Sequence, residues 1–245
     1  MNRDDLLDWT RLTRDPNDGT ARRHVLRELL SRRELDDDRD LIDVVIERIA
    51  GKRVLDVGVV SHTMDYVSKK GWRHALVAEH ASYCLGIDIL ADEVERLRAD
   101  GYNVRVADAT SDEDLKERFD VVFIGDVIEH VDNPVRLLAF GCRHLLPKGV
   151  VLAATPNPFS RKFFRRFSRE GTMVTNLDHV AWITPSMALE LGRRAGLELK
   201  RYCLAKRLPA NPIVRTARRV GRLFTPVEMA YPDYLYEFAP AGSAS

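Results

Sequence analysis

Four short apolar runs in this chain each end on an acidic residue, and this series constrains the fold more than any other feature. The runs cover residues 54–56, 85–88, 104–108 and 121–126. Runs of this length, bounded by glycine, aspartate or charged residues, are typical of buried parallel strands. Helical patterns lie between them, so the series predicts repeated strand–helix units joined by right-handed crossovers.

The acids that end these runs are Asp56, Asp88, Asp108 and Asp126. In a parallel sheet, ligands bind outside the carboxyl ends of the strands, near the point where the strand order reverses. Four carboxylates at that edge form an acceptor-rich rim, which suits a ligand that carries many hydroxyl and amino donors. A phosphate-rich ligand would be repelled there.

Six segments resemble, in order, the motifs of class I S-adenosylmethionine-dependent methyltransferases: 53–62, Asp88, Asp108-Ala109, 119–131, 146–158 and 179–185. The fourth looks like the Glu-His-Val version found in the small-molecule and sugar-tailoring branch. The resemblance runs from about Ile49 to Leu204. It implies an α/β fold with a doubly wound, Rossmann-like, seven-stranded sheet, mostly parallel with an antiparallel last strand.

The same resemblance implies S-adenosyl-L-methionine as the cofactor, held at the strand ends. The matching positions are Asp56, Gly58, Val59, His62, Asp88, Ile89, Asp108, Ala109, Asp126 and Val127. Asp88 would accept hydrogen bonds from the ribose, although a helix N-cap is the alternative for this residue. Asp126 would face the methionine amine or cap the next turn.

The chain departs from the family in the loop after the first strand. The family carries three alternating glycines there, whereas this chain keeps Gly58 and has Val60 and His62 at the other two positions. The missing glycines argue against a dinucleotide cofactor, whose pyrophosphate needs a close backbone approach. They also leave open a protein that has lost cofactor binding.

Methyl transfer from a sulfonium to a hydroxyl needs an aligned acceptor and a group that removes its proton. His179 and His130 are the candidate bases, with Asp178 as an orienting group for His179. A histidine at the start of a helix, bonded to backbone, is the alternative for His130. His74 is expected to be a packed helix histidine. No metal site is expected, because the histidines and acids do not gather at ligand spacing in the sequence.

The chain divides into an N-terminal preface, a methyltransferase domain and a short tail. We expect a helical preface or lid at 1–50, the domain at 51–239, and a disordered tail at 240–245. Within the domain, a helix at 185–195 precedes an antiparallel pair of strands at 197–204 and 234–238. Two basic segments interrupt it, an Arg/Phe-rich insertion at 156–180 and a proline-broken stretch at 208–226.

Charge is distributed unevenly along the chain. Residues 1–150 carry a net charge of −7, whereas residues 151–245 carry +8. A basic surplus of this kind can attract a phosphate-bearing substrate, an anionic membrane surface or nucleic acid, or it can be only a solvated helix face. The interleaved Phe and Arg residues around Phe163 favour contact with something anionic and partly apolar.

Composition places the chain among ordinary globular proteins. No apolar run is long enough to span a bilayer, and no signal-peptide core follows the first residues. The three cysteines, Cys84, Cys142 and Cys203, are widely spaced and indicate buried thiols in a reducing compartment. We therefore expect a cytoplasmic protein.

Three functional hypotheses follow from the sequence. The leading one is a methyltransferase that acts on a hydroxyl of a small-molecule or sugar-containing acceptor, which the basic region would suit if the acceptor is phosphate-linked. The second is an RNA methyltransferase that uses the basic region as a backbone track. The third is a non-catalytic binding or scaffold protein that has kept the fold. The sequence does not indicate an oligomeric state.

Overall fold

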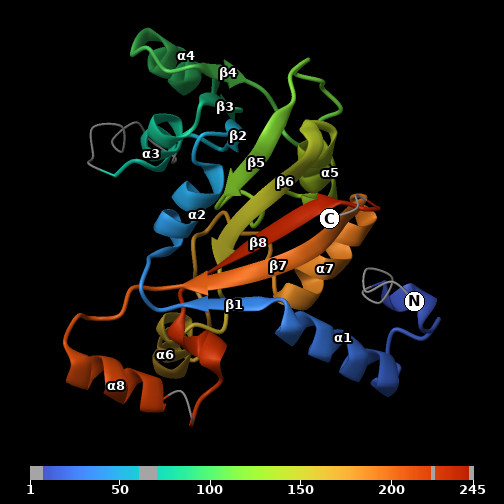
Figure 1. The fold of residues 1–245 in the computed structure, drawn as a ribbon, viewed down its shortest axis with the longest axis vertical. Helices are drawn as coiled ribbons and strands as arrows, with labels where there is room; N and C mark the ends of the chain where they lie inside the picture. The colour runs from blue at the N-terminus through green and yellow to red at the C-terminus, as the bar shows by residue number, and fades with distance from the viewer. Residues whose placement is uncertain (1–7, 61–70, 222–223, 243–245) are drawn as a thin grey trace.

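The computed structural model describes residues 8–60, 71–221 and 224–242, which form one twisted sheet with helices packed around it (Figure 1). The strands are β1 (Arg33–Asp36), β2 (Arg53–Val57), β3 (Tyr83–Asp88), β4 (Val104–Val106), β5 (Phe119–Gly125), β6 (Leu145–Pro156), β7 (Leu197–Ala205) and β8 (Asp233–Pro240). Their order across the sheet is β1-β7-β8-β6-β5-β2-β3-β4. The chain order reverses between β2 and β5, which marks the expected ligand edge.

Eight α-helices connect or flank the strands in the described residues. They are α1 (Gly19–Ser31), α2 (Leu41–Ile49), α3 (Arg73–His80), α4 (Ala91–Ala99), α5 (Pro134–Arg143), α6 (Arg161–Glu170), α7 (Pro185–Arg194) and α8 (Pro212–Gly221). Two 3₁₀ helices, η2 (Trp9–Arg11) and η4 (Val227–Ala230), are also present. No described helix is both long and apolar enough to cross a bilayer.

The sheet has eight strands rather than the seven that the sequence predicts. The additional strand is β1, which lies at the sheet edge and pairs in parallel with β7. Its sequence, Arg-Glu-Leu-Asp, has no apolar run because an edge strand needs little burial, so hydrophobic pattern alone misses it. Its acid Glu34 instead forms ion pairs with Arg48 and Arg201.

The last two predicted strands are confirmed as an antiparallel pair. β8 lies between β7 and β6 and is antiparallel to both, whereas the other neighbours in the sheet are parallel. Tyr202 of β7 lies opposite Tyr236 of β8, and both are fully buried. Tyr236 donates its hydroxyl to the carbonyl of Ile183, so the aromatic core satisfies its polar atoms.

The two faces of the sheet carry separate apolar clusters. On β2, Leu55 and Val57 belong to the larger cluster, while Val54 packs with α2 and with Val77 of α3 on the other face. This alternation follows from the period of two along a strand. Asp56 therefore shares a face with Val54, on the side of the sheet where α2 and α3 pack.

The basic insertion forms α6, which lies near α8 at one end of the molecule (Figure 1). Arg161 at the start of α6 donates to the hydroxyl of Thr225, which follows α8. Phe163 is buried against Trp182 with ring centroids 5.0 Å apart, whereas Phe164 and Phe167 are about half exposed. The helix ends at Gly171, whose φ of 71° suits glycine. The tail expected at 240–245 begins with the last residue of β8, and its residues 243–245 lie outside the described part of the chain.

Candidate active site

A cavity of about 1220 Å³ lies at the carboxyl ends of the central strands. Among the strand-end residues predicted for the cofactor, those that line it are Gly58, Asp88, Ile89, Asp108, Ala109, Asp126 and Val127. Both predicted bases, His130 and His179, also line it. Convergence of residues from β2, β3, β4 and β5 is what a parallel sheet produces, because those strands all end at one edge.

Two of the predicted residues are placed differently, and a third is not among the described residues. Asp56 and Val59 are buried, 1% and 3% exposed, and neither lines the cavity. His62 lies outside the described residues. The rim therefore has three described carboxylates at its surface rather than four.

Asp56 points into the protein and contacts His74 of α3. The His74 Nδ1 to Asp56 Oδ2 distance is 2.8 Å, and His74 is only 2% exposed. A carboxylate can only accept, so Nδ1 carries the proton. The expectation that His74 is a packed and satisfied histidine matches this contact, and the pair fastens α3 beneath the loop that follows β2.

Backbone and side-chain contacts hold residues 58–60, the described start of the loop after β2. Gly58 has φ 77°, and a Cβ there would lie 2.3 Å from Cγ2 of Val127, so only glycine fits. The Val60 amide donates to Asp88 Oδ2 at 2.9 Å, and the Trp72 indole donates to the Val59 carbonyl at 3.2 Å. These bonds hold residues 58–60, which include the first two of the three positions where the family has glycines.

Asp88 holds backbone as well as lining the cavity. Besides Val60, it accepts from the Leu90 amide at 3.1 Å, and its side chain is 8% exposed. The residue at the N-cap of α4 is Leu90. The carboxylate thus joins the ends of β2 and β3.

Arg73 is a cavity residue that the sequence analysis did not single out. Its guanidinium donates to Asp126 Oδ2 at 2.8 Å, to the Gly125 carbonyl at 2.7 Å and to the Gly58 carbonyl at 3.3 Å. Asp126 has φ 49°, in the left-handed region that residues other than glycine seldom adopt. Arg73 stands between Trp72 and His74, and no sequence pattern marked it as a cavity residue.

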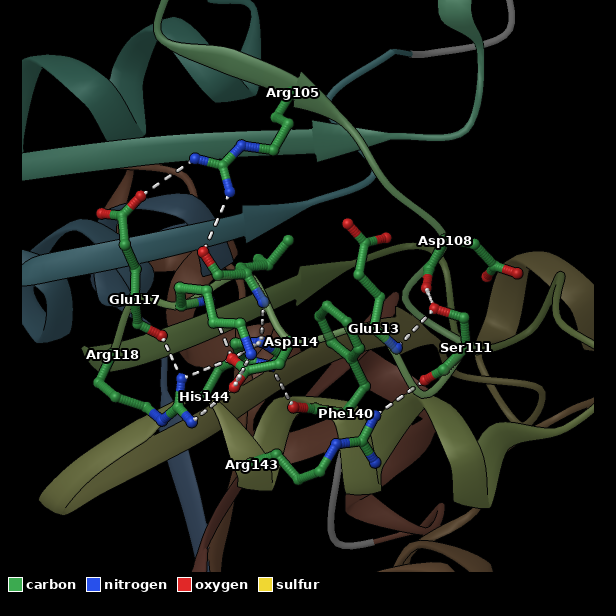
Figure 2. A network of polar contacts seen from close by, with 12 residues as sticks. Arg105, Asp108, Ser111, Glu113, Asp114, Glu117, Arg118, Phe140, Arg143 and His144 are labelled. Atoms are coloured by element: carbon green, nitrogen blue, oxygen red, sulfur yellow. Dashed lines mark hydrogen bonds and ion pairs between the residues drawn. The ribbon is translucent and has the colours of Figure 1, made fainter.

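A polar network fixes the loop after β4 that carries Asp108 and Ala109 (Figure 2). Asp108 accepts from the amide and the hydroxyl of Thr110, and Arg143 donates to the Ser111 carbonyl at 2.8 Å. His144 accepts from the Leu115 amide through Nε2, while its Nδ1 bonds the Phe140 carbonyl. Burial lowers the pKa of His144, which keeps it in the neutral form that this bonding requires.

The same cavity is lined by a cluster of four ionisable groups, Glu129, His130, Asp178 and His179. His130 Nδ1 lies 3.1 Å from Asp178 Oδ2, and the rings of His130 and His179 are perpendicular with centroids 4.5 Å apart. The loop that carries His179 is tied to Glu129, whose carbonyl accepts from the Val180 amide at 2.9 Å. Asp178 therefore pairs with His130, whereas the sequence suggested it for His179.

Glu129 is the buried member of this cluster. It is 1% exposed, its Oε2 accepts from Thr155 at 3.0 Å, and its Oε1 has no hydrogen-bond partner among the described residues. Burial, reinforced by the nearby charge of Asp126, raises the pKa of Glu129 to about 7. The sequence did not single out this residue.

Glu129, His130 and His179 could also hold a metal ion. One ligand atom from each lies within 4.8 Å of the other two. A metal site was not expected from the sequence, because His179 is far from the other two residues along the chain. The structure corrects that premise, since the fold brings the three groups together.

Two further charged residues line the cavity near α6. Burial and the charge of Asp126 raise the pKa of Asp233 to about 6, while Lys162 and Lys206 oppose this rise. Lys162 also lines the cavity. Asp233 begins β8, and the sequence had no signal for it because the strand was expected to start one residue later.

Comparison with known proteins places the chain in a family. A family model described as a methyltransferase domain matches residues 21–201, well over half of the chain. The chain belongs to the methyltransferase domain family. The expectation of an S-adenosylmethionine-dependent methyltransferase is thereby confirmed at the level of the family.

Curated relatives of this methyltransferase include two enzymes named for the same reaction. The ubiquinone biosynthesis O-methyltransferase of Neisseria meningitidis serogroup A is 27% identical over 169 residues, which are 62% of this chain and 66% of that protein. The enzyme of the same name from Cereibacter sphaeroides is 30% identical over 158 residues, 60% of this chain and 61% of that protein. The methyltransferase thus spans less than two-thirds of the length of these relatives.

Solved structures share the fold of this methyltransferase. An S-adenosylmethionine-dependent methyltransferase from Archaeoglobus fulgidus superposes with a TM-score of 0.51 at 20% identity, over 80% of this chain and 93% of that one. One from Mesorhizobium loti gives a TM-score of 0.51 at 17% identity, over 80% and 94%. At these identities the similarity shows a common fold.

Proposed function

We propose that this protein transfers the methyl group of S-adenosylmethionine to a hydroxyl of a small-molecule, sugar-containing acceptor. The observation that carries the proposal is that two groups of side chains line one cavity. The strand-end group is Asp88, Asp108 and Asp126, and the second group is Glu129 with two histidines. The first group suits a ligand rich in hydroxyl and amino donors, and the second suits proton removal from an acceptor.

Cofactor binding is supported by residues 58–60, the described start of the loop after β2. Gly58 has the left-handed backbone conformation that suits glycine. The Val60 amide donates a hydrogen bond to the Asp88 carboxylate, so it is satisfied at the edge of the cavity. These contacts favour a binding-competent site over a scaffold that has lost its ligand. In this proposal Asp88 and Asp108 accept from the nucleoside, and the methionine end lies between Gly58 and Asp126.

Proton removal is assigned to the histidine pair. Asp178, 3.1 Å from His130 Nδ1, would orient that imidazole and stabilise it when it takes the proton of the acceptor, in the manner of other carboxylate–histidine pairs. His179, edge-on to His130, would hold the acceptor oxygen in line with the methyl group. Oxygen as the acceptor atom is also the chemistry in the names of the curated relatives.

An RNA substrate is the competing assignment, since α6 and α8 are basic. Glu129 is buried, and His130 and His179 line the same cavity, which favours a small acceptor that can enter it. Salt-sensitive retention of RNA would favour the alternative.

Calorimetric titration with S-adenosylmethionine, and separately with NAD, tests the cofactor. We expect micromolar binding of the first alone, and an acceptor screen would then begin with nucleotide sugars. His130→Ala and His179→Ala should lower kcat while the cofactor Kd stays close to that of the parent. Absence of cofactor binding would refute the proposal, and unchanged turnover in both variants would remove the histidine pair from the mechanism.

A further inference from the structure

A second cavity of about 330 Å³ lies at the start of α6, beside the main one. Its lining carries four cations and no acid: Ser160, Arg161, Lys162, Arg165, Lys206, Leu208 and residues 229–232. Within the described part of the chain, none of these four cations forms an ion pair with a carboxylate. Lys162 and Lys206 act electrostatically on Asp233, but this acid lines the main cavity and not the small one.

Ser160 is the unusual group in this cavity. It is 3% exposed, and its Oγ has no hydrogen-bond partner among the described residues. It also occupies the N-cap position of α6 but makes no side-chain capping bond. A buried hydroxyl is normally bonded, so an orphan that lines a cavity marks a place for a ligand atom.

The backbone of α6 adds to the same preference. The first amide groups of a helix lack partners within the helix, and the helix dipole gives this end a partial positive charge. Helix starts of this kind bind phosphate when side-chain donors converge on them. Here four cations and a hydroxyl converge on the first turn of a ten-residue helix.

The small cavity adjoins the candidate active site. Ser160, Lys162 and Pro232 line both cavities. A ligand could therefore place an anionic group at α6 while its uncharged part extends toward His130 and His179. The strand-end acids Asp88, Asp108 and Asp126 would repel the same anionic group. The ligand would therefore bind with its anionic end at α6 and not at the strand ends.

We propose that this cavity is an anion subsite that binds a phosphoryl group carried by the methyl acceptor. The inference rests on the proposed function for its meaning, since it names the class of acceptor as phosphorylated. Binding itself is a property of the cavity and can be measured without turnover. Arginine and lysine contribute charge-assisted hydrogen bonds, and the Ser160 hydroxyl donates one more.

The test is calorimetric titration of the full chain, saturated with S-adenosylhomocysteine, with inorganic pyrophosphate. We expect Arg165→Gln and Lys206→Gln each to weaken binding about tenfold, the loss that goes with one charge-assisted bond. Ser160→Ala should weaken it several-fold without loosening α6, because the hydroxyl makes no capping bond. Arg169→Gln is the matched control, since Arg169 is exposed on the same helix and does not line the cavity.

Circular dichroism and thermal melts would establish that each variant is folded before its affinity is interpreted. Two further probes identify the source of the phosphoryl group. Binding of a hexose 1-phosphate would indicate a soluble acceptor, and binding of a short-chain phosphatidic acid below its micelle concentration would indicate a lipid-linked one. Either result supports the subsite when Arg165→Gln weakens it.

The proposal is overturned if millimolar pyrophosphate does not bind, or if the lining variants bind as tightly as the control. It is also overturned if single-stranded RNA binds more tightly and Arg169→Gln weakens that binding equally, because a backbone track uses every exposed cation alike. If pyrophosphate binds but S-adenosylmethionine does not, the proposed function fails while the subsite stands.

Discussion

Replacing His74 with alanine should be among the most damaging single changes in this fold. Asp56 is 1% exposed, and its Oδ1 has no hydrogen-bond partner among the described residues. Its Oδ2 bonds to His74 at 2.8 Å. Without the imidazole, neither oxygen of a buried carboxylate would be bonded, and breaking a buried pair in this way costs about 3–5 kcal/mol.

Packing adds to that loss. The His74 ring lies 5.2 Å from the ring of Trp72 and 5.9 Å from that of Tyr102, measured between centroids. A single-domain protein has roughly 5–15 kcal/mol of total stability, so His74→Ala should remove a third or more of it. The variant should unfold at markedly lower urea concentration with an unchanged m value.

Urea unfolding followed by circular dichroism is the assay. His80→Ala is the matched control, because His80 lies on the same helix and is exposed. The double variant Asp56→Ala/His74→Ala should lose at least about 1 kcal/mol less than the sum of the two single variants, since the second change removes the stranded charge. A loss of less than about 1 kcal/mol in His74→Ala, or one equal to that of His80→Ala, would refute this account of the pair.

Three further changes test the cavity. Asp88→Ala should weaken S-adenosylmethionine binding by about 1.5–3 kcal/mol, because charged hydrogen bonds are lost; an unchanged calorimetric Kd would contradict the ribose assignment. Burial raises the pKa of Asp233 to about 6, above the 3.8 of the unfolded chain, so the folded state holds this proton more tightly and stability falls as pH rises between these values. Asp233→Asn should therefore raise the free energy of unfolding above pH 6 by at most about 3 kcal/mol and leave it unchanged near pH 4, which urea titrations at the two pH values would check. Gly58→Ala should lower stability by about 1–3 kcal/mol, because φ is 77° and the new methyl would meet Val127; parent-like unfolding and cofactor affinity would show that the loop adjusts.

The strands of the central sheet were predictable because strands that are buried on both faces consist of continuous apolar runs. The edge strand β1 was not, since Arg33–Asp36 carries three charged residues and only one apolar one. The ends of the central strands could be placed at one edge because runs of this kind indicate parallel strands, whose carboxyl ends lie together. The side of the sheet to which an acid points depends on strand phase, and Asp56 follows Val54 onto the face of α3 rather than into the cavity.

The group of Glu129, His130 and His179 could be predicted only in part. The motif around Glu129 and His130 is local, so a sequence reveals it, but the approach of His179 depends on backbone bonds between the Val180 and Ala181 amides and the Glu129 carbonyl. Such bonds have no signature in residue type. The small basic cavity was visible only as excess charge, because it forms where Lys206 and α6 meet in space.

The two outer strands of the sheet have a consequence for how the chain behaves as it folds. β1 has four residues and β4 has three, so neither offers a long row of open amides and carbonyls to a neighbouring molecule. β7, with nine residues, would be such a row if β1 were absent. By pairing with β7, the short N-terminal strand covers an edge that could otherwise pair with another molecule. We therefore expect a chain shortened past residue 36 to aggregate during refolding, even though it retains all the cavity residues.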